Sequence, residues 1–322
     1  MIKISPYHHS FSGDNNNLKN LDNIDTLTTN TILGQNAGAK NESTSGSGIF
    51  IGYEAGRNAR NPNKNVFIGY RSGYKSSGDS NNVFIGTETG YNNTTGSDNV
   101  FIGKDSGYHN RYGNSNVFIG KDSGKINSTG NENVFLGPSS GAKNLSGSSN
   151  VFLGMHSGGS NSYGNNNVFV GTRTGQNNLT GDSNVFVGTN TGQNNTIGSK
   201  NTFVGINSGQ QNYRGNANVF MGTGAGSSNS QGSSNVFCGI DAGQNNQDGN
   251  ENVFIGKSTG KSSQYGSKNV FIGDSCGNQN YKGSKNVFIG NFAGSNSQQS
   301  DNNIFIGYNS GAYNSTSILT IN

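Results

Sequence analysis

The sequence has little charge and no long hydrophobic run. Charged residues make up 12% of its 322 residues and the formal net charge is +4, with no basic block of the kind that indicates nucleic-acid binding. No stretch approaches the ~20 apolar residues of a membrane helix, so we expect no membrane insertion. Residues 1–17 lack the apolar core of a secretory signal. We therefore expect an extracellular, cell-surface or virion protein that reaches its place without a classical signal peptide, or alternatively a cytoplasmic one.

Cysteine is also scarce. The two cysteines, Cys238 and Cys276, lie two repeats apart at different positions of the repeat described below. A disulfide needs Cα atoms within about 7 Å, which two strand spacings of ~4.8 Å do not readily allow. Both are interpreted as small core residues, and the redox compartment stays open.

What the sequence does contain is a phenylalanine that returns every 17 residues, within Asn-Val-Phe-Ile-Gly or a close variant of it. A fixed short period is typical of stacked coils, each of which buries its apolar residues against its neighbours. The series predicts an all-β parallel β-solenoid, a β-roll or β-helix of about 17 coils, over residues 31–311. The phenylalanines of this structural ladder are Phe50, Phe67, Phe84, Phe101, Phe118, Phe135, Phe152, Phe169, Phe186, Phe203, Phe220, Phe237, Phe254, Phe271, Phe288 and Phe305.

Residues on either side of the repeat are expected to serve the ends of the stack. Residues 1–30 are interpreted as an N-terminal cap or attachment segment, and residues 312–322 as a C-terminal capping or inter-subunit strand. Solenoid ends expose unpaired strand edges that usually need covering. We expect Met1 to Ile4 and Ile318 to Ile321 to cap the stack or to pair between subunits.

Within one coil, Val-Phe-Ile predicts a short strand bounded by turn residues. Glycine recurs two, six and twelve residues after the phenylalanine, which suggests three bends with positive φ or tight turns. Asparagine recurs two residues before it, where stacked amides can bond from coil to coil. The asparagine ladder contains Asn65, Asn82, Asn99, Asn116, Asn133 and Asn150.

Strand parity separates two apolar ladders. Alternate residues face opposite sides of a strand, so Phe shares a face with Asn while Val and Ile lie on the other. One solenoid wall has only one inside, and the invariant Asn favours Phe there. The second ladder is then a possible interface with another chain, unless the coil's own loops cover it. Its first members are Val66, Ile68, Val83, Ile85, Val100, Ile102, Val117 and Ile119.

The Asn-Val-Phe-Ile-Gly core, followed by a small residue and Gly, resembles the short repeats of trimeric autotransporter adhesin heads. It is also similar to Asn-Thr-Phe-Ile-Gly repeats of phage and viral fibre proteins. The resemblance implies a left-handed roll, a trimer and an adhesive role, with Val and Ile facing the roll interior. The 17-residue period and the Phe in place of a small Ala depart from the adhesin heads. Apart from the resemblance, the handedness stays open.

Chemistry motifs are matched only as by-products of the repeat. Gly-x-Ser-x-Gly occurs at residues 137–141, 256–260 and 273–277 because small residues recur between repeat glycines, without the strand-to-helix turn that a nucleophile elbow needs. We expect no enzyme, no catalytic or metal-binding residue and no cofactor. The sequence instead predicts a structural, self-assembling fibre or filament protein whose partner is itself, as a trimer or filament. The alternative is a viral, phage or surface adhesin that uses Tyr91, Tyr108 and Tyr112 to bind host glycans or receptors.

Overall fold

The computed structural model describes residues 30–40, 47–60, 64–313 and 319–321. The chain divides into two compact units, residues 1–150 and 151–322, and each is described by itself. In both units the described residues form a parallel β-solenoid and contain no helix. The fold class predicted from the 17-residue repeat is therefore confirmed.

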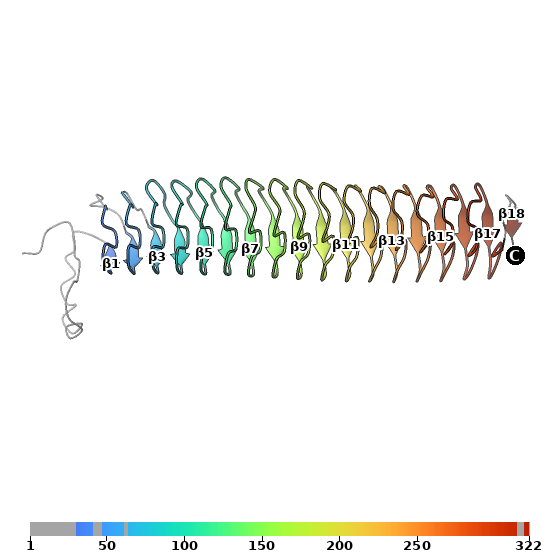
Figure 1. The fold of residues 1–322 in the computed structure, drawn as a ribbon, viewed down its shortest axis with the longest axis horizontal. Helices are drawn as coiled ribbons and strands as arrows, with labels where there is room; N and C mark the ends of the chain where they lie inside the picture. The colour runs from blue at the N-terminus through green and yellow to red at the C-terminus, as the bar shows by residue number, and fades with distance from the viewer. Residues whose placement is uncertain (1–29, 41–46, 61–63, 314–318, 322) are drawn as a thin grey trace, which may run out of the picture. The chain divides into compact units, whose positions relative to one another are not determined.

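The strands of the first unit are three residues long and centre on the repeat phenylalanine (Figure 1). Neighbouring strands pair in parallel, and the register places each phenylalanine beside the next, as Phe84 beside Phe101. The first strand carries Ile32 in this place, beside Phe50. The strands are β1 (Thr31–Leu33), β2 (Ile49–Ile51), β3 (Val66–Ile68), β4 (Val83–Ile85), β5 (Val100–Ile102), β6 (Val117–Ile119) and β7 (Val134–Leu136).

The second unit repeats the same arrangement. Its strands are β8 (Val151–Leu153), β9 (Val168–Val170), β10 (Val185–Val187), β11 (Thr202–Val204), β12 (Val219–Met221), β13 (Val236–Cys238), β14 (Val253–Ile255), β15 (Val270–Ile272), β16 (Val287–Ile289), β17 (Ile304–Ile306) and β18 (Leu319–Ile321). β18 pairs with β17 and places Thr320 where a phenylalanine would stand. The C-terminal strand thus stacks on the last coil, whereas residues 1–29, 314–318 and 322 lie outside the described residues.

The phenylalanine ladder forms the interior of each unit. The side chains of Phe50 to Phe305 in this series are fully buried. The Phe50 and Phe67 rings are tilted by 44°, but later rings stack nearly parallel, with centroids 4.8 Å apart between Phe84 and Phe101 and 4.7 Å apart between Phe186 and Phe203. This is the orientation that strand parity favoured, and the opposite of the one implied by the adhesin resemblance. Val and Ile point outward from the same strand, so Phe is the apolar side chain that fills the interior.

Two asparagine columns accompany the phenylalanines inside. In the column two residues before Phe, Asn99 Nδ2 donates to Asn82 Oδ1 at 3.2 Å and to the Gly113 carbonyl at 2.9 Å. In the column nine residues after Phe, Asn110 Nδ2 donates to Asn93 Oδ1 at 2.8 Å and also to the Gly113 carbonyl. Both columns therefore run toward the N-terminal end of the unit, each amide donating to the one before it. Buried amides are tolerated because their donors and acceptors are paired.

Four backbone positions of the coil adopt positive φ, and two of them are not glycine. In the coil of Phe101 the glycines are Gly103 (φ 121) and Gly107 (φ 58), and the other two residues are Asp98 (φ 59) and Asp105 (φ 56). Of the positive φ or tight turn predicted for the third glycine column, positive φ does not occur at Gly113. A Cβ at Gly113 would instead collide with Asn110 Oδ1 and with the Gly130 carbonyl of the next coil. That glycine is needed for close approach between coils, not for its dihedral angle.

Candidate interaction surfaces

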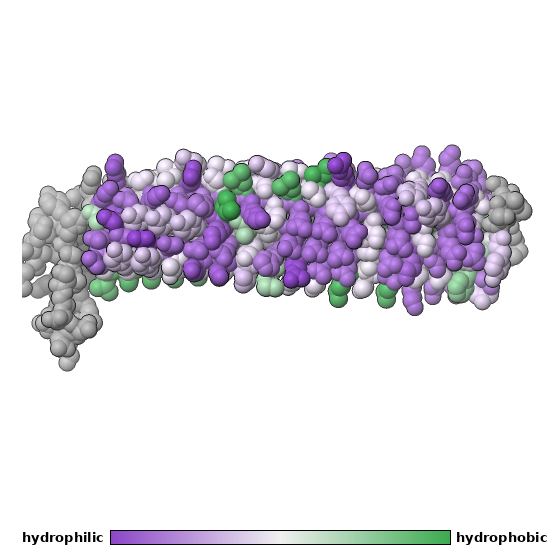
Figure 2. All heavy atoms as spheres, viewed as in Figure 1, coloured by the Kyte–Doolittle hydropathy of each residue, from purple (hydrophilic) through white to green (hydrophobic). Residues whose placement is uncertain are grey.

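The valine and isoleucine columns of the strands form the outer surface that we call the Val/Ile wall. In the first unit its rows pair from coil to coil, Val83 beside Val100 and Ile85 beside Ile102. Each side chain is partly covered by its neighbours above and below, but Ile85 and Ile119 keep 36% and 38% of their surface exposed. In the second unit Val185 and Ile255 keep 38% and 40%. The face drawn in Figure 2 is mostly hydrophilic, with hydrophobic residues chiefly near the edges of the view.

The first unit carries a column of stacked tyrosines at a corner of the coil. Tyr74 and Tyr91 lie parallel with centroids 4.8 Å apart, and Tyr91 and Tyr108 follow at 5.0 Å. Burial against the neighbouring ring raises the pKa of Tyr91 and Tyr108. Of the three tyrosines proposed from the sequence, Tyr91 and Tyr108 are thus half-buried in a ladder, while Tyr112 is 53% exposed. Tyr74 is not among the tyrosines named from the sequence, although its spacing of 17 residues from Tyr91 could have identified it.

Cations surround this tyrosine column. Arg57 and Arg71 lie 5.9 and 5.8 Å from the centroid of the Tyr74 ring. Both also pair with the buried carboxylate of Glu54, Arg71 through its Nε at 2.8 Å. The two guanidinium charges are therefore partly neutralised within the protein, which lowers their availability to an anionic ligand.

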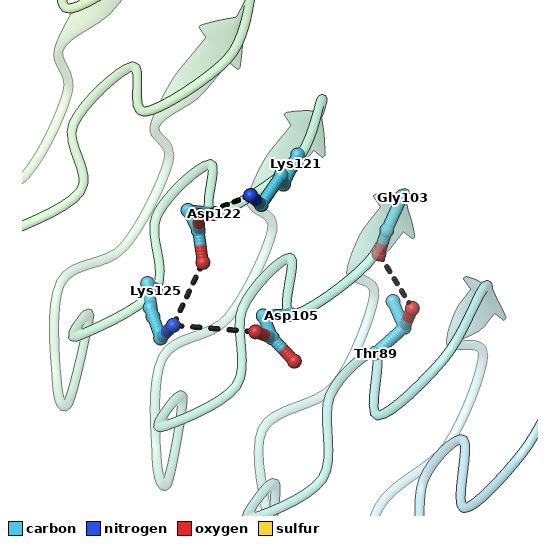
Figure 3. A network of polar contacts seen from close by, with 6 residues as sticks. All are labelled: Thr89, Gly103, Asp105, Lys121, Asp122 and Lys125. Carbon is cyan, nitrogen blue, oxygen red and sulfur yellow. Dashed lines mark hydrogen bonds and ion pairs between the residues drawn. The ribbon is translucent and has the colours of Figure 1, made fainter.

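A second ionic cluster lies further along the same unit (Figure 3). Lys125 Nζ lies 2.7 Å from Asp122 Oδ1 and 3.2 Å from Asp105 Oδ2, so that it bridges two coils. The hydrogen bond to Asp122 raises the pKa of Lys125. On the same coils, Thr89 Oγ1 donates to the Gly103 carbonyl at 2.7 Å. The bonds of Lys125 to Asp105 and of Thr89 to Gly103 join successive coils, which is a structural role, while Asp105 Oδ1 is buried without a hydrogen-bond partner among the described residues.

Besides Glu54, the first unit buries the carboxylate of Asp79. Asp79 occupies the place that glycine holds in the later coils, and it receives hydrogen bonds from Asn65 Nδ2 at 3.0 Å, from Asn93 Nδ2 and from Ser76 Oγ. Desolvation raises the pKa of Asp79 to about 6, although these donors oppose the shift. Asn65 and Asn93 are the first members of the two amide columns. At its N-terminal end, each column therefore donates a hydrogen bond to the Asp79 carboxylate.

The two thiols lie in different surroundings, which corrects the interpretation of both as core residues. Cys276 is fully buried and its thiol lies 3.2 Å from the Phe288 carbonyl, in the place where other coils use serine. Burial raises the pKa of Cys276 to about 12. Cys238, by contrast, is half-buried on the Val/Ile wall, beside Met221 and Ile255. It lies outward because it stands one residue after a buried Phe.

The described ranges contain no cluster of three or more His, Cys, Asp or Glu side chains arranged to hold a metal ion. Nor do they include a helix that is long and apolar enough to cross a bilayer. Two of the predicted Gly-x-Ser-x-Gly serines, Ser139 and Ser275, stand at the left-handed corner that every coil has, with φ of 56° and 55°. Their backbone geometry is therefore that of the repeat.

Comparisons with protein-family models, with curated proteins and with solved structures found no match. The likeness to autotransporter adhesin heads accordingly rests on the short motif alone. The structure supports the broader part of this likeness, a parallel β-solenoid with a 17-residue period.

Proposed function

We propose that this chain is a structural, self-assembling fibre or filament protein that associates with copies of itself through the Val/Ile wall. The observation that carries the proposal is the outward direction of the Val and Ile columns, whose members keep more than a third of their surface exposed at positions such as Ile85, Ile119 and Ile255. Soluble monomers rarely leave a continuous apolar strip of this kind in contact with water.

A second copy of the chain is the partner that fits the wall along its length. From Phe67 to Phe135 in the first unit, the phenylalanine rings of successive coils repeat with centroids 4.7 to 5.0 Å apart. Every copy carries the same rows at the same spacing, so the side chains of one wall can enter the gaps of another coil after coil. Dry interfaces between stacked β-sheets are built in this way. A partner without this spacing would match the wall over only one or two coils.

The interior supports a mechanical role. Each buried phenylalanine contributes on the order of 1.5–3 kcal/mol by transfer from water, and each is coupled to the next coil by a parallel strand and by amide bonds. A stack of this kind is expected to be stiff and resistant to proteases. Such a fibre would suit a virion or cell surface, reached without a classical signal peptide; a cytoplasmic filament is the alternative.

The test replaces three wall residues by serine in one variant, Val100→Ser, Val117→Ser and Val134→Ser. We expect this variant to stay folded by circular dichroism and to sediment as a monomer, while the native chain forms trimers or filaments visible by electron microscopy. A matched control carries Thr87→Ser, Lys104→Ser and Lys121→Ser on an exposed polar corner of neighbouring coils and should assemble like the native chain. If the wall variant assembles normally, the Val/Ile wall is not the interface.

A second candidate function is a recognition module, a fibre tip or adhesin that binds host glycans or receptors. It is favoured by aromatic side chains at exposed corners, including Tyr112 and Tyr163 at 53% and 51% exposure. Discrete particles that bind glycans, rather than long filaments, would support this candidate over the first.

A further inference from the structure

The last coils of the second unit contain a depression on a corner of the solenoid, with a volume of about 350 Å³. Its lining comes from three successive coils, those of Phe271, Phe288 and Phe305. The residues that carry the argument are Asn278, Gln279, Phe292, Asn296, Tyr308 and Asn309. None of the residues that line it carries a charge.

Phe292 is unusual at its place in the repeat. It stands four residues after Phe288, at the left-handed corner, and has a φ of 59°. Other coils place polar or small residues there, among them Asn190, Asn207 and Asn309. A bulky aromatic residue at positive φ is costly, by roughly 1–2 kcal/mol, and strain of this kind tends to accumulate at ligand sites. Phe292 nevertheless keeps 40% of its surface exposed, so interior packing does not account for it.

The aromatic rings of the depression are open, unlike the tyrosine ladder of the first unit. Tyr308 is 70% exposed and meets Phe292 edge to face, with centroids 6.5 Å apart and an angle of 85° between the planes. In the ladder, Tyr91 lies between the parallel rings of Tyr74 and Tyr108, and both of its faces are covered. A ligand that packs on a ring face therefore finds room at Phe292 and Tyr308 but not at Tyr91.

The polar part of the lining consists of side-chain amides held on a fixed backbone. Asn278, Gln279, Asn296 and Asn309 each offer a donor and an acceptor group. The Gln279 N–H donates to the Ser295 carbonyl at 2.8 Å and the Asn309 N–H to the Asn291 carbonyl at 3.0 Å. Because these backbone bonds join neighbouring coils, the main chain that carries the amides is fixed before any ligand arrives, which lowers the entropy cost of binding.

We infer that this depression binds a neutral sugar unit of a glycan. The apolar face of a pyranose ring would pack on Phe292 and Tyr308, and its hydroxyl groups would exchange hydrogen bonds with the surrounding amides. Hydroxyls donate and accept as amides do, and the lining combines the rings of Phe292, Tyr308 and Tyr313 with a larger number of polar groups. The absence of a lining cation disfavours an anionic sugar. The inference rests on the recognition role, and it needs no association through the Val/Ile wall.

The experiment measures binding of the full chain to immobilised maltohexaose, cellohexaose and chitohexaose, with dextran sulfate as the anionic comparison. We expect at least one neutral oligosaccharide to bind and dextran sulfate to bind more weakly. Phe292→Asn should weaken binding about tenfold, the loss of one aromatic contact. Because asparagine occupies the same corner in four other coils, this variant should fold at least as well as the native chain.

Arg173→Asn, an exposed residue at the same left-handed corner of an earlier coil, is the matched control and should bind like the native chain. If Tyr112→Ser abolishes binding while Phe292→Asn leaves it intact, the recognition role stands and this site is wrong. Binding of dextran sulfate alone would also overturn the site. A chain that binds none of the probes contradicts the site.

Discussion

At the scale of single residues, position 79 has aspartate where later coils of the unit have glycine, and position 76 has serine where they have asparagine. The two departures compensate each other. The Asp79 carboxylate accepts the hydrogen bond from Asn93 Nδ2 that an asparagine at position 76 would accept in the regular column. A negative charge at the donor end of two aligned amide columns is favourable for the same reason as an acid at a helix N-terminus. The desolvation of the buried Asp79 carboxylate opposes this favourable interaction.

This balance predicts a pH dependence. The pKa of Asp79 is about 6 in the folded chain against an ordinary value of 3.8. A raised folded pKa means that the folded state prefers the protonated form, so this contribution to stability is complete below pH 3.8 and is lost as the pH rises through 6. The difference corresponds to about 3 kcal/mol. We expect backbone hydrogen exchange in residues 64–100 to slow as the pH falls from 7 to 5, after correction for the intrinsic rate.

Asp79→Asn should remove this dependence, because the amide does not titrate. The surface variant Asp98→Asn, which alters an exposed carboxylate of the next coil, should keep it. A pH dependence that survives in Asp79→Asn would assign it to another group.

At the scale of elements, the amide columns depend on continuity. In the second unit, the column nine residues after Phe has serine instead of asparagine at position 263. No neighbouring described side chain replaces the missing amide, as Asp79 does in the first unit. Asn246 Oδ1, Ser263 Oγ and both amide atoms of Asn280 are buried without a hydrogen-bond partner among the described residues. A buried polar group left unpaired costs about 1–3 kcal/mol, so the column is weakest at this place.

Ser263→Asn is therefore expected to stabilise the second unit. The new amide would donate to Asn246 Oδ1 and accept from Asn280 Nδ2, as Asn110 does between its neighbours. We expect a gain of about 1–2 kcal/mol, measured as slower hydrogen exchange in residues 246–300 and a higher unfolding temperature. The isosteric control Ser263→Cys adds no amide and should bring no gain. A loss of stability in Ser263→Asn would mean that the larger side chain does not fit the column.

At the scale of the whole molecule, Cys238 is a natural reporter of association. It lies half-buried on the Val/Ile wall, whereas Cys276 is fully buried with a pKa raised to about 12. In dilute, unassembled chain we expect maleimide to modify Cys238 and not Cys276, because only the thiolate of an accessible cysteine reacts. If copies associate through the wall, Cys238 should become protected as the protein concentration rises.

The variant with serine at positions 100, 117 and 134 is the control for this measurement, since its Cys238 should react equally at all concentrations. Cys276→Ser provides a chain with a single thiol, and serine already fills that place in other coils. Oligomers that form while Cys238 stays fully reactive would show that another face makes the contact.

The sequence by itself determined the solenoid, its period, and the separation of Phe from Val and Ile. These follow from local rules, because the alternation of side chains along a strand and a strict repeat hold coil by coil. The invariant Asn on the Phe face favoured Phe inside, against the motif resemblance, but the choice between the two ladders was decided by the buried rings of the structure. By the same alternation, Cys238 points outward, as Ile102 does in its own coil. The expectation that Cys238 is a core residue did not take this alternation into account.

Only the tertiary structure decided the rest. The left-handed corners at Asp98 and Asp105 are filled by many residue types, so no sequence column marks them, and the glycine at position 113 is required by a carbonyl of the next coil. The roles of Asp79 and Phe292 likewise depend on which side chains neighbouring coils bring within reach. A repeat specifies how one coil stacks on the next. What happens where the repeat changes depends on the space and the unpaired polar groups that the stack leaves at that place.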